Sequence, residues 1–137
     1  MIAYLDSSVL LRLVLGQRDA LREWKEVSRG VVSSLVEVES LRTLDRLRLE
    51  AKLPDSDIAT RREAIFRIPA TTETVELTRP VLDRAALPLP VTLGTLDAIH
   101  LASAQHLNDP DLEFVTYDAR LADAARAHGL RVVQPGR

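Results

Sequence analysis

Short apolar runs alternate with segments of helical periodicity along this 137-residue sequence. Strands are expected at 2–5, 31–35, 112–117 and 130–133, with a weaker strand or turn at 66–72. Helices are expected at about 7–15, 21–27, 36–53, 56–66, 72–87, 95–107 and 118–129, and Pro80 either kinks the fifth of these or starts a new helix. Such an order favours parallel strands covered by helices on both faces. The sequence therefore predicts an α/β fold.

The composition is that of an ordinary globular domain: 46% of the residues are hydrophobic and 28% are charged. The absence of cysteine excludes disulfides and thiolate metal sites. No apolar run is long enough to span a bilayer, and Asp6 and Arg12 interrupt the first apolar stretch. We therefore expect a single domain over 1–137, without a membrane segment, in the cytoplasm.

Acidic residues follow or flank several of the predicted strands. Asp6 comes directly after the strand 2–5, and Asp118 directly after 112–117. Glu37 and Glu39 lie within two turns of the strand 31–35, and Asp97 lies in the first turn of its own helix. Because ligands of open α/β sheets bind outside the carboxyl ends of the strands, these acids are candidates for one site.

Each acid also has a structural interpretation. Asp at a strand-to-helix joint is most often a helix N-cap, and an acid in a first turn suits the helix dipole. Taken together, however, several carboxylates at one sheet edge repel one another unless they share protons or a cation. With oxygen ligands only, Mg²⁺ or Mn²⁺ is the natural cation, and its chemistry is that of phosphodiester hydrolysis or phosphoryl transfer.

The remaining polar residues near these joints are interpreted as supporting groups. No histidine has another histidine at helical spacing. His100, one turn from Asp97, could assist the site, but a packed or surface residue is the preferred interpretation. Ser7, Ser8 and Thr116 are interpreted as hydroxyls that line the site, because no Ser–His–Asp order is evident.

Four segments together resemble the PIN-domain ribonucleases, most closely toxins of the VapC type. They are "YLDSSVLLRLVL", "VVSSLVEVESLRTL", "LGTLDAIHLASA" and "FVTYDARLADAARAHGLRVVQP". The resemblance covers nearly the whole chain and leaves only about 52–90 uninformative. It implies a three-layer α/β/α sandwich with a parallel sheet of about five strands.

The resemblance also assigns the site. It implies that the catalytic and metal-binding acids are Asp6, Glu39, Asp97 and Asp118, with Ser7 and Thr116 lining the site. Helical periodicity alone leaves Glu37 and Glu39 open, and the family pattern selects Glu39. One or two Mg²⁺ ions would be held mainly by Asp6 and Asp97, and Mn²⁺ could substitute.

The activity implied is Mg²⁺-dependent endoribonucleolytic cleavage by the toxin of a toxin–antitoxin pair. A small antitoxin and a homodimer within a larger complex are the implied protein partners. A PIN-domain nuclease that processes RNA without being a toxin, and an inactive PIN-like module that binds RNA or protein, remain alternatives at this point.

Global charge gives no sign of RNA binding, since the net charge is -2 and the isoelectric point about 5.9. Of the 18 basic residues, all but Lys25 and Lys52 are arginines, a bias for which a GC-rich genome is the simpler explanation. Possible RNA contacts are Arg42 and Arg46, then Arg48, Arg61 and Arg62. A solvated helix face, with Asp45 and Glu50 as ion-pair partners, explains these arginines equally well.

Overall fold

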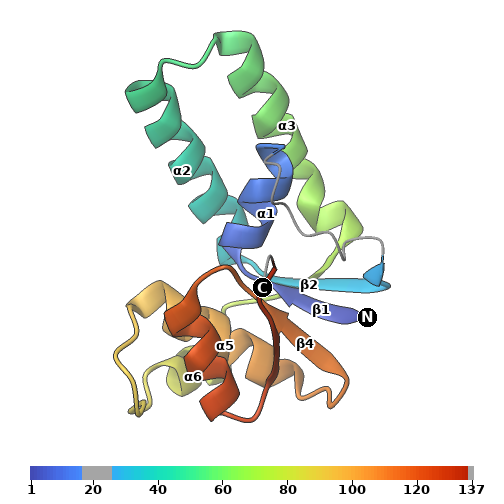
Figure 1. Ribbon diagram of the computed structural model, residues 1–137, viewed down its shortest axis with the longest axis vertical. Helices are drawn as coiled ribbons and strands as arrows, with labels where there is room; N and C mark the ends of the chain where they lie inside the picture. Colours follow the sequence, from blue (N-terminus) through green and yellow to red (C-terminus); the bar gives the residue numbers. More distant parts are fainter. Residues whose placement is uncertain (17–25, 136–137) are drawn as a thin grey trace.

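The computed structural model describes residues 1–16 and 26–135, and in these ranges five strands form one parallel sheet (Figure 1). The strands lie side by side in the order β3-β2-β1-β4-β5. Their bounds are β1 (Ile2–Leu5), β2 (Arg29–Ser33), β3 (Glu73–Val75), β4 (Leu112–Val115) and β5 (Arg131–Val133). Because β1 is central and Leu5 pairs with Val115 of β4, both strands end at the middle of the same sheet edge.

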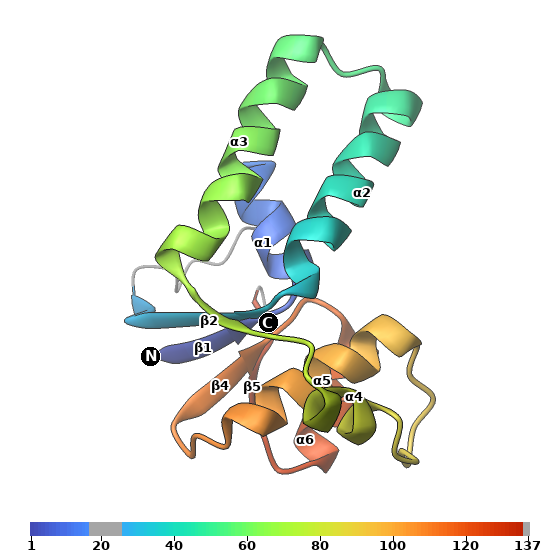
Figure 2. The same cartoon turned by 180° about the vertical axis from the view of Figure 1, so that it is seen from behind.

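Helices cover both faces of this sheet, as Figure 2 shows from behind. One layer holds α1 (Ser7–Val14), α2 (Leu35–Ala51) and α3 (Asp55–Thr71), and the other holds α4 (Arg79–Ala85), α5 (Thr95–Leu107) and α6 (Ala119–Ala127). The predicted three-layer sandwich is therefore confirmed. The paired helices α2 and α3 extend well beyond the sheet. None of the helices in the described ranges is long and apolar enough to cross a membrane.

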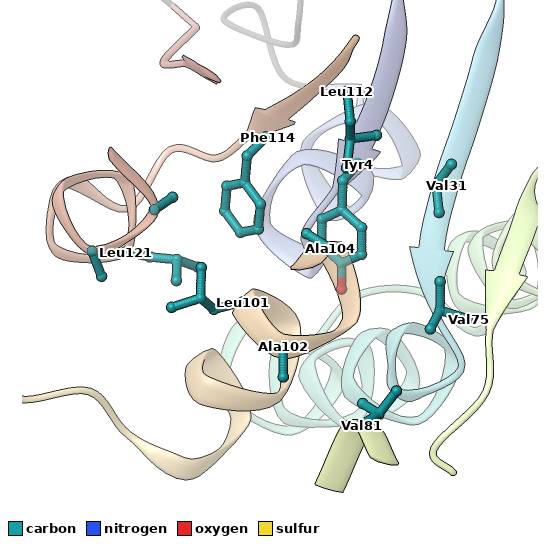
Figure 3. Packing of buried hydrophobic residues seen from close by; sticks show 12 residues of the cluster. Tyr4, Val31, Val75, Val81, Leu101, Ala102, Ala104, Leu112, Phe114 and Leu121 are labelled. Atoms are coloured by element: carbon teal, nitrogen blue, oxygen red, sulfur yellow. The ribbon is translucent and has the colours of Figure 1, made fainter. Parts of the chain in front are cut away.

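Alternating side chains of the central strands divide the core into two clusters. Tyr4 and Phe114 point toward α5 and α6 and stack on each other (Figure 3). Leu5 and Val115, one residue further along each strand, pack on the opposite side with α1 and α2. This period of two, with apolar residues on both faces, is typical of a parallel strand covered on both sides.

Two of the site candidates begin helices. Asp6 is the N-cap of α1, and its side chain accepts a hydrogen bond from the backbone N–H of Val9. Asp118 is the N-cap of α6 and accepts from the N–H groups of Arg120 and Leu121. The capping interpretation of both residues is thus confirmed, and each cap uses only one carboxylate oxygen, Oδ1.

The middle of the chain differs from the sequence prediction. Helix α3 runs to Thr71, through Pro69, instead of ending near 66 before a weak strand. Ile65 and Ile68 are both buried, and Ile68 belongs to the core cluster that includes Leu5 and Val32 of the sheet, which holds the last turns in place. The hydroxyls of Thr71 and Thr72 donate to the Ile68 carbonyl.

The helix predicted over 72–87 was wrong as well. That range holds the short edge strand β3 and then α4, and Pro80 lies in the first turn of α4, so it starts a new helix. The helix predicted at 21–27 falls mainly on residues 17–25, which lie outside the described ranges.

Candidate active site

The four acids assigned by resemblance come from two strand-to-helix joints and from the first two turns of two helices, which open on one edge of the sheet. Asp6 follows β1, Asp118 lies three residues beyond the end of β4, Asp97 is in the first turn of α5, and Glu39 is in the second turn of α2. The backbone N–H of Asp6 donates to the carbonyl of Val115 at 3.4 Å, which ties the two central joints together.

Asp6 is the most buried of these acids, with 4% of its surface exposed. One carboxylate oxygen, Oδ1, accepts from the Ser8 hydroxyl at 2.5 Å and from the Val9 N–H at 3.2 Å. The other oxygen, Oδ2, accepts from the Thr116 hydroxyl at 2.5 Å. Burial raises the pKa of Asp6, and these hydrogen bonds oppose that shift only in part.

The hydroxyl of Thr116 links two acids. Besides donating to Asp6, it accepts a hydrogen bond from the backbone N–H of Asp118 at 3.0 Å. The side chain of Asp118 itself is exposed and caps α6. One buried hydroxyl therefore fixes both the orientation of the Asp6 carboxylate and the backbone position of Asp118.

The pKa of Asp97 depends on the other three acids. This pKa is raised first by partial burial and then by the negative charge of Asp118, with further contributions from Asp6 and Glu39. Since all three other acids influence Asp97, the structure brings the four carboxylates into one electrostatic neighbourhood.

Glu39 is held by contacts from two other elements. Its Oε2 accepts from the Ser7 hydroxyl at 3.4 Å, and its Oε1 lies 2.6 Å from Nε2 of His100. The second imidazole nitrogen of His100, Nδ1, lies 2.7 Å from the hydroxyl of Tyr4. A continuous chain of polar groups thus runs from the core strand β1 through α5 to the acid on α2.

The four carboxylates lie near one another, but their present positions do not form a complete coordination shell for a metal ion. Within residues 1–16 and 26–135, no three acidic or histidine side chains lie close enough to hold an ion as they stand. The donor set nevertheless suits a hard divalent cation, because it consists of carboxylate oxygens. The pKa values of Asp6 and Asp97 are both raised, which means that the folded protein disfavours their negative charges. A bound cation would compensate these charges.

The sequence profile of the PIN domain matches residues 3–127. This chain belongs to the PIN-domain family. Ribonuclease VapC46 from Mycobacterium tuberculosis is 38% identical to it over 135 residues, which cover 96% of each chain. Ribonuclease VapC35 from the same species is 37% identical over 140 residues, covering 97% of this chain and 96% of the relative.

Solved structures share the fold of this PIN domain. A chain of a toxin–antitoxin complex from Klebsiella pneumoniae superimposes with a TM-score of 0.70 at 19% identity, and the match covers 98% of both chains. A chain from the structure of FitAB bound to an IR36 DNA fragment gives a TM-score of 0.74 at 15% identity, over 98% of this chain and 95% of that one. At such identities the likeness concerns the fold.

The geometry separates Glu39 from Glu37, which periodicity could not do. Glu39 turns toward Ser7 and His100, whereas Glu37 lines a different cavity beside Pro69 and Glu76. In this PIN domain only Glu39 of the two lies with the other candidate acids. Its role as a metal ligand stays a prediction.

A cavity of about 360 Å³ adjoins this side of the site and is lined by Ser7, Val38, Glu39, Arg42, Thr43 and Leu96. Arg42 therefore shares this cavity with Glu39, while its guanidinium pairs with Asp45 at 3.3 Å. Arg46, one turn further along α2, is exposed and does not line this cavity. Of these two candidate RNA contacts, Arg42 is the one that lines a cavity together with a candidate acid.

Sequence reasoning overlooked Tyr4 and preferred a purely structural interpretation of His100. His100 is indeed packed, with 1% of its surface exposed, but it contacts a site acid instead of merely filling the core. The spacing held a signal for both residues. His100 is three residues after Asp97 and so shares its helix face, and Tyr4 is two residues before Asp6 and so points to the same side of the strand.

Proposed function

We propose that this PIN domain is a metal-dependent endoribonuclease that acts in the cytoplasm as the toxin of a toxin–antitoxin pair. The observation that carries the proposal is the gathering of Asp6, Glu39, Asp97 and Asp118 at one edge of the sheet, where partial burial and then the charges of the other three acids raise the pKa of Asp97. Repelling carboxylates gathered at a sheet edge are suited to a divalent cation and to phosphodiester chemistry. The naming of two close relatives as VapC ribonucleases supports RNA as the substrate.

The cation proposed is Mg²⁺, with Mn²⁺ as a substitute. Asp6 and Asp97 would be its main ligands, and Glu39 and Asp118 would complete the site directly or through water. When bound, such an ion polarises a phosphoryl oxygen and makes water a better nucleophile at neutral pH.

The residues of the chain would have three tasks in this reaction. Ser8 and Thr116 orient the Asp6 carboxylate through the hydrogen bonds described above. One carboxylate of the group accepts the proton of the attacking water as the new P–O bond forms and the old one breaks. Arg42 lies where it can pair with an RNA phosphate and offset the negative charge of the acids, and Arg46 could extend this contact along α2.

The test is RNA cleavage by the wild type and by Asp6→Asn, each with Mg²⁺ or with EDTA. We expect cleavage only by the wild type with Mg²⁺, and a loss of about 100-fold or more in Asp6→Asn. Asp123→Asn is a matched control, because this exposed acid on α6 pairs with the surface residue Arg126. Equal cleavage in EDTA, or undiminished cleavage by Asp6→Asn, would overturn the proposal.

The toxin role and its partners have their own test. Induced expression in a host cell should arrest growth, and co-expression of the neighbouring antitoxin gene should relieve the arrest. Light scattering on the purified protein, alone and with that partner, measures whether a homodimer and a larger complex form. Cleavage of RNA in vitro without growth arrest would instead identify a nuclease that processes RNA.

A further inference from the structure

A buried polar chain connects the core of the protein to Glu39. We infer that Tyr4 and His100 are positioning residues: Tyr4 donates to Nδ1 of His100, so that Nε2–H of His100 donates to Glu39 and fixes its carboxylate for the site. The function of Glu39 itself rests on the proposed nuclease activity. The positioning chain is a property of this chain's own residues and can be measured without a metal.

The packing around the chain leaves these groups little freedom. Tyr4 has none of its surface exposed and His100 has 1%. The ring of Tyr4 stacks on Phe114 at a centroid distance of 5.2 Å and meets the imidazole edge-on at 5.9 Å. Figure 3 shows Tyr4 reaching from β1 toward α5, with Phe114 beside it. The ring contacts with Phe114 and His100 thus fix the position of the Tyr4 hydroxyl relative to the imidazole.

The direction of the hydrogen bonds follows from the carboxylate of Glu39, whose oxygen accepts the hydrogen bond from Nε2–H of His100. With the ring proton on Nε2, Nδ1 is an acceptor, and the buried hydroxyl of Tyr4 donates to it. Ser33 and Ser103 also interact with this hydroxyl, but the contact of 2.7 Å is with Nδ1 of His100. An Nδ1 that accepts a hydrogen bond leaves the ring proton on Nε2, 2.6 Å from Oε1 of Glu39.

The two oxygens of the Glu39 carboxylate therefore have different partners. His100 occupies Oε1 of Glu39, while Oε2 faces Ser7 at the sheet edge, where the other acids lie. A ligand whose orientation is fixed beforehand binds a metal more tightly than one that must first be ordered. Removal of such a supporting partner typically weakens metal affinity by 10–100-fold.

The first test is a double-mutant cycle read by titration calorimetry with Mn²⁺. Tyr4→Phe removes only the hydroxyl, and we expect it to weaken Mn²⁺ binding by about 10-fold. In a Glu39→Gln background the same change should have no further effect, because the group that Tyr4 positions is already lost. An equal loss in both backgrounds would mean that Tyr4 acts on the fold in general, and it would overturn the inference.

Substitutions of His100 give a graded version of this test. His100→Gln keeps an amide N–H that can reach Glu39, whereas His100→Leu keeps none. We expect Mn²⁺ affinity to decrease in the order wild type, His100→Gln, His100→Leu. His106→Gln is the matched control, because His106 is exposed on the same helix. Should His100→Leu fail to fold, Tyr4→Phe and His100→Gln still decide the question, and equal affinity in all variants contradicts the inference.

A measurement without metal separates this inference from the proposed function. Nitrogen-15 spectra of the imidazole should show the Nε2–H tautomer in the wild type and a mixture of tautomers in Tyr4→Phe. An Nδ1–H tautomer or a doubly protonated ring in the wild type would overturn the inference. A wild type with the expected tautomer that neither binds Mn²⁺ nor cleaves RNA would refute the nuclease and leave the positioning chain standing.

Discussion

Single residues at the site combine structural and chemical tasks. Asp6 and Asp118 cap α1 and α6, and the same backbone geometry that makes them caps aims them at the sheet edge. Thr116 holds both through one hydroxyl. Capping and catalysis are therefore compatible interpretations of these acids, because a carboxylate has two oxygens and a cap uses one of them.

Asp97→Asn should stabilise the protein at neutral pH. The folded state raises the pKa of Asp97, so it binds this proton more tightly than the unfolded chain, and its stability falls as pH rises above about 4. Asparagine carries no charge and escapes this loss. Because Asp97 is only partly buried, the gain in unfolding free energy is expected to be about 0.5–1 kcal/mol at pH 7.

Urea unfolding of both proteins between pH 4 and pH 8, without divalent cations, measures this difference. The gain should shrink as the pH falls toward 4, because Asp97 is protonated in both states only below the ordinary pKa of aspartate. Asp123→Asn, an exposed acid of α6, should show no such dependence on pH. A variant less stable than the wild type throughout would contradict the cause assigned to the pKa shift.

Thr116→Val should disable the site with little change in shape. Valine matches threonine in size, but it leaves Oδ2 of Asp6 without its donor and the N–H of Asp118 without its acceptor. Since Thr116 is fully buried, we expect a loss of about 1–3 kcal/mol in unfolding free energy and a marked loss of RNA cleavage. Thr116→Ser keeps the hydroxyl and should retain most of both, which thermal melts and cleavage assays can compare.

At the scale of helices and strands, secondary structure was predicted most accurately where the local hydrophobic pattern agrees with the packing of the folded protein. The apolar runs at β1 and β4, each followed by an acid, predicted both the strands and the edge at which Asp6 and Asp118 lie. The passage of α3 through Pro69 could not be predicted, because burial of the last turns against the sheet outweighs a local helix-breaking signal. Likewise, contacts across elements and not periodicity distinguish Glu39 from Glu37.

Helix α2 ends at a residue with an unfavourable backbone. Lys52 is its C-cap and has a φ of 51°, in the left-handed region that a side chain disfavours. Lys52→Gly should therefore raise the unfolding free energy by about 0.5–1 kcal/mol. Lys52→Ala removes the same long side chain but keeps the Cβ atom, so chemical denaturation should show no comparable gain. Equal effects of both changes would assign the gain to the lysine side chain instead.

On the scale of the whole molecule, the site exists only where the three layers meet. Glu39 comes from the layer of α2, Asp97 and His100 come from α5 on the opposite face, and Asp6 lies between them at the end of the central strand. Folding therefore concentrates negative charge that the unfolded chain keeps apart. A cation that binds these acids together has no equivalent site in the unfolded chain, so its binding energy adds to the stability of the fold.

Divalent cations should accordingly stabilise the folded protein as a whole. At a Mg²⁺ or Mn²⁺ concentration ten times the dissociation constant, the expected gain is about 1.4 kcal/mol, which raises the Tm by about 3–6 °C in a domain of this size. EDTA should reverse the shift, and sodium chloride at equal ionic strength should not reproduce it. Thermal melts of Asp97→Asn and Glu39→Gln should show a smaller shift than the wild type, since each lacks a charged ligand. A shift of the same size in both variants would place the cation somewhere other than among these acids.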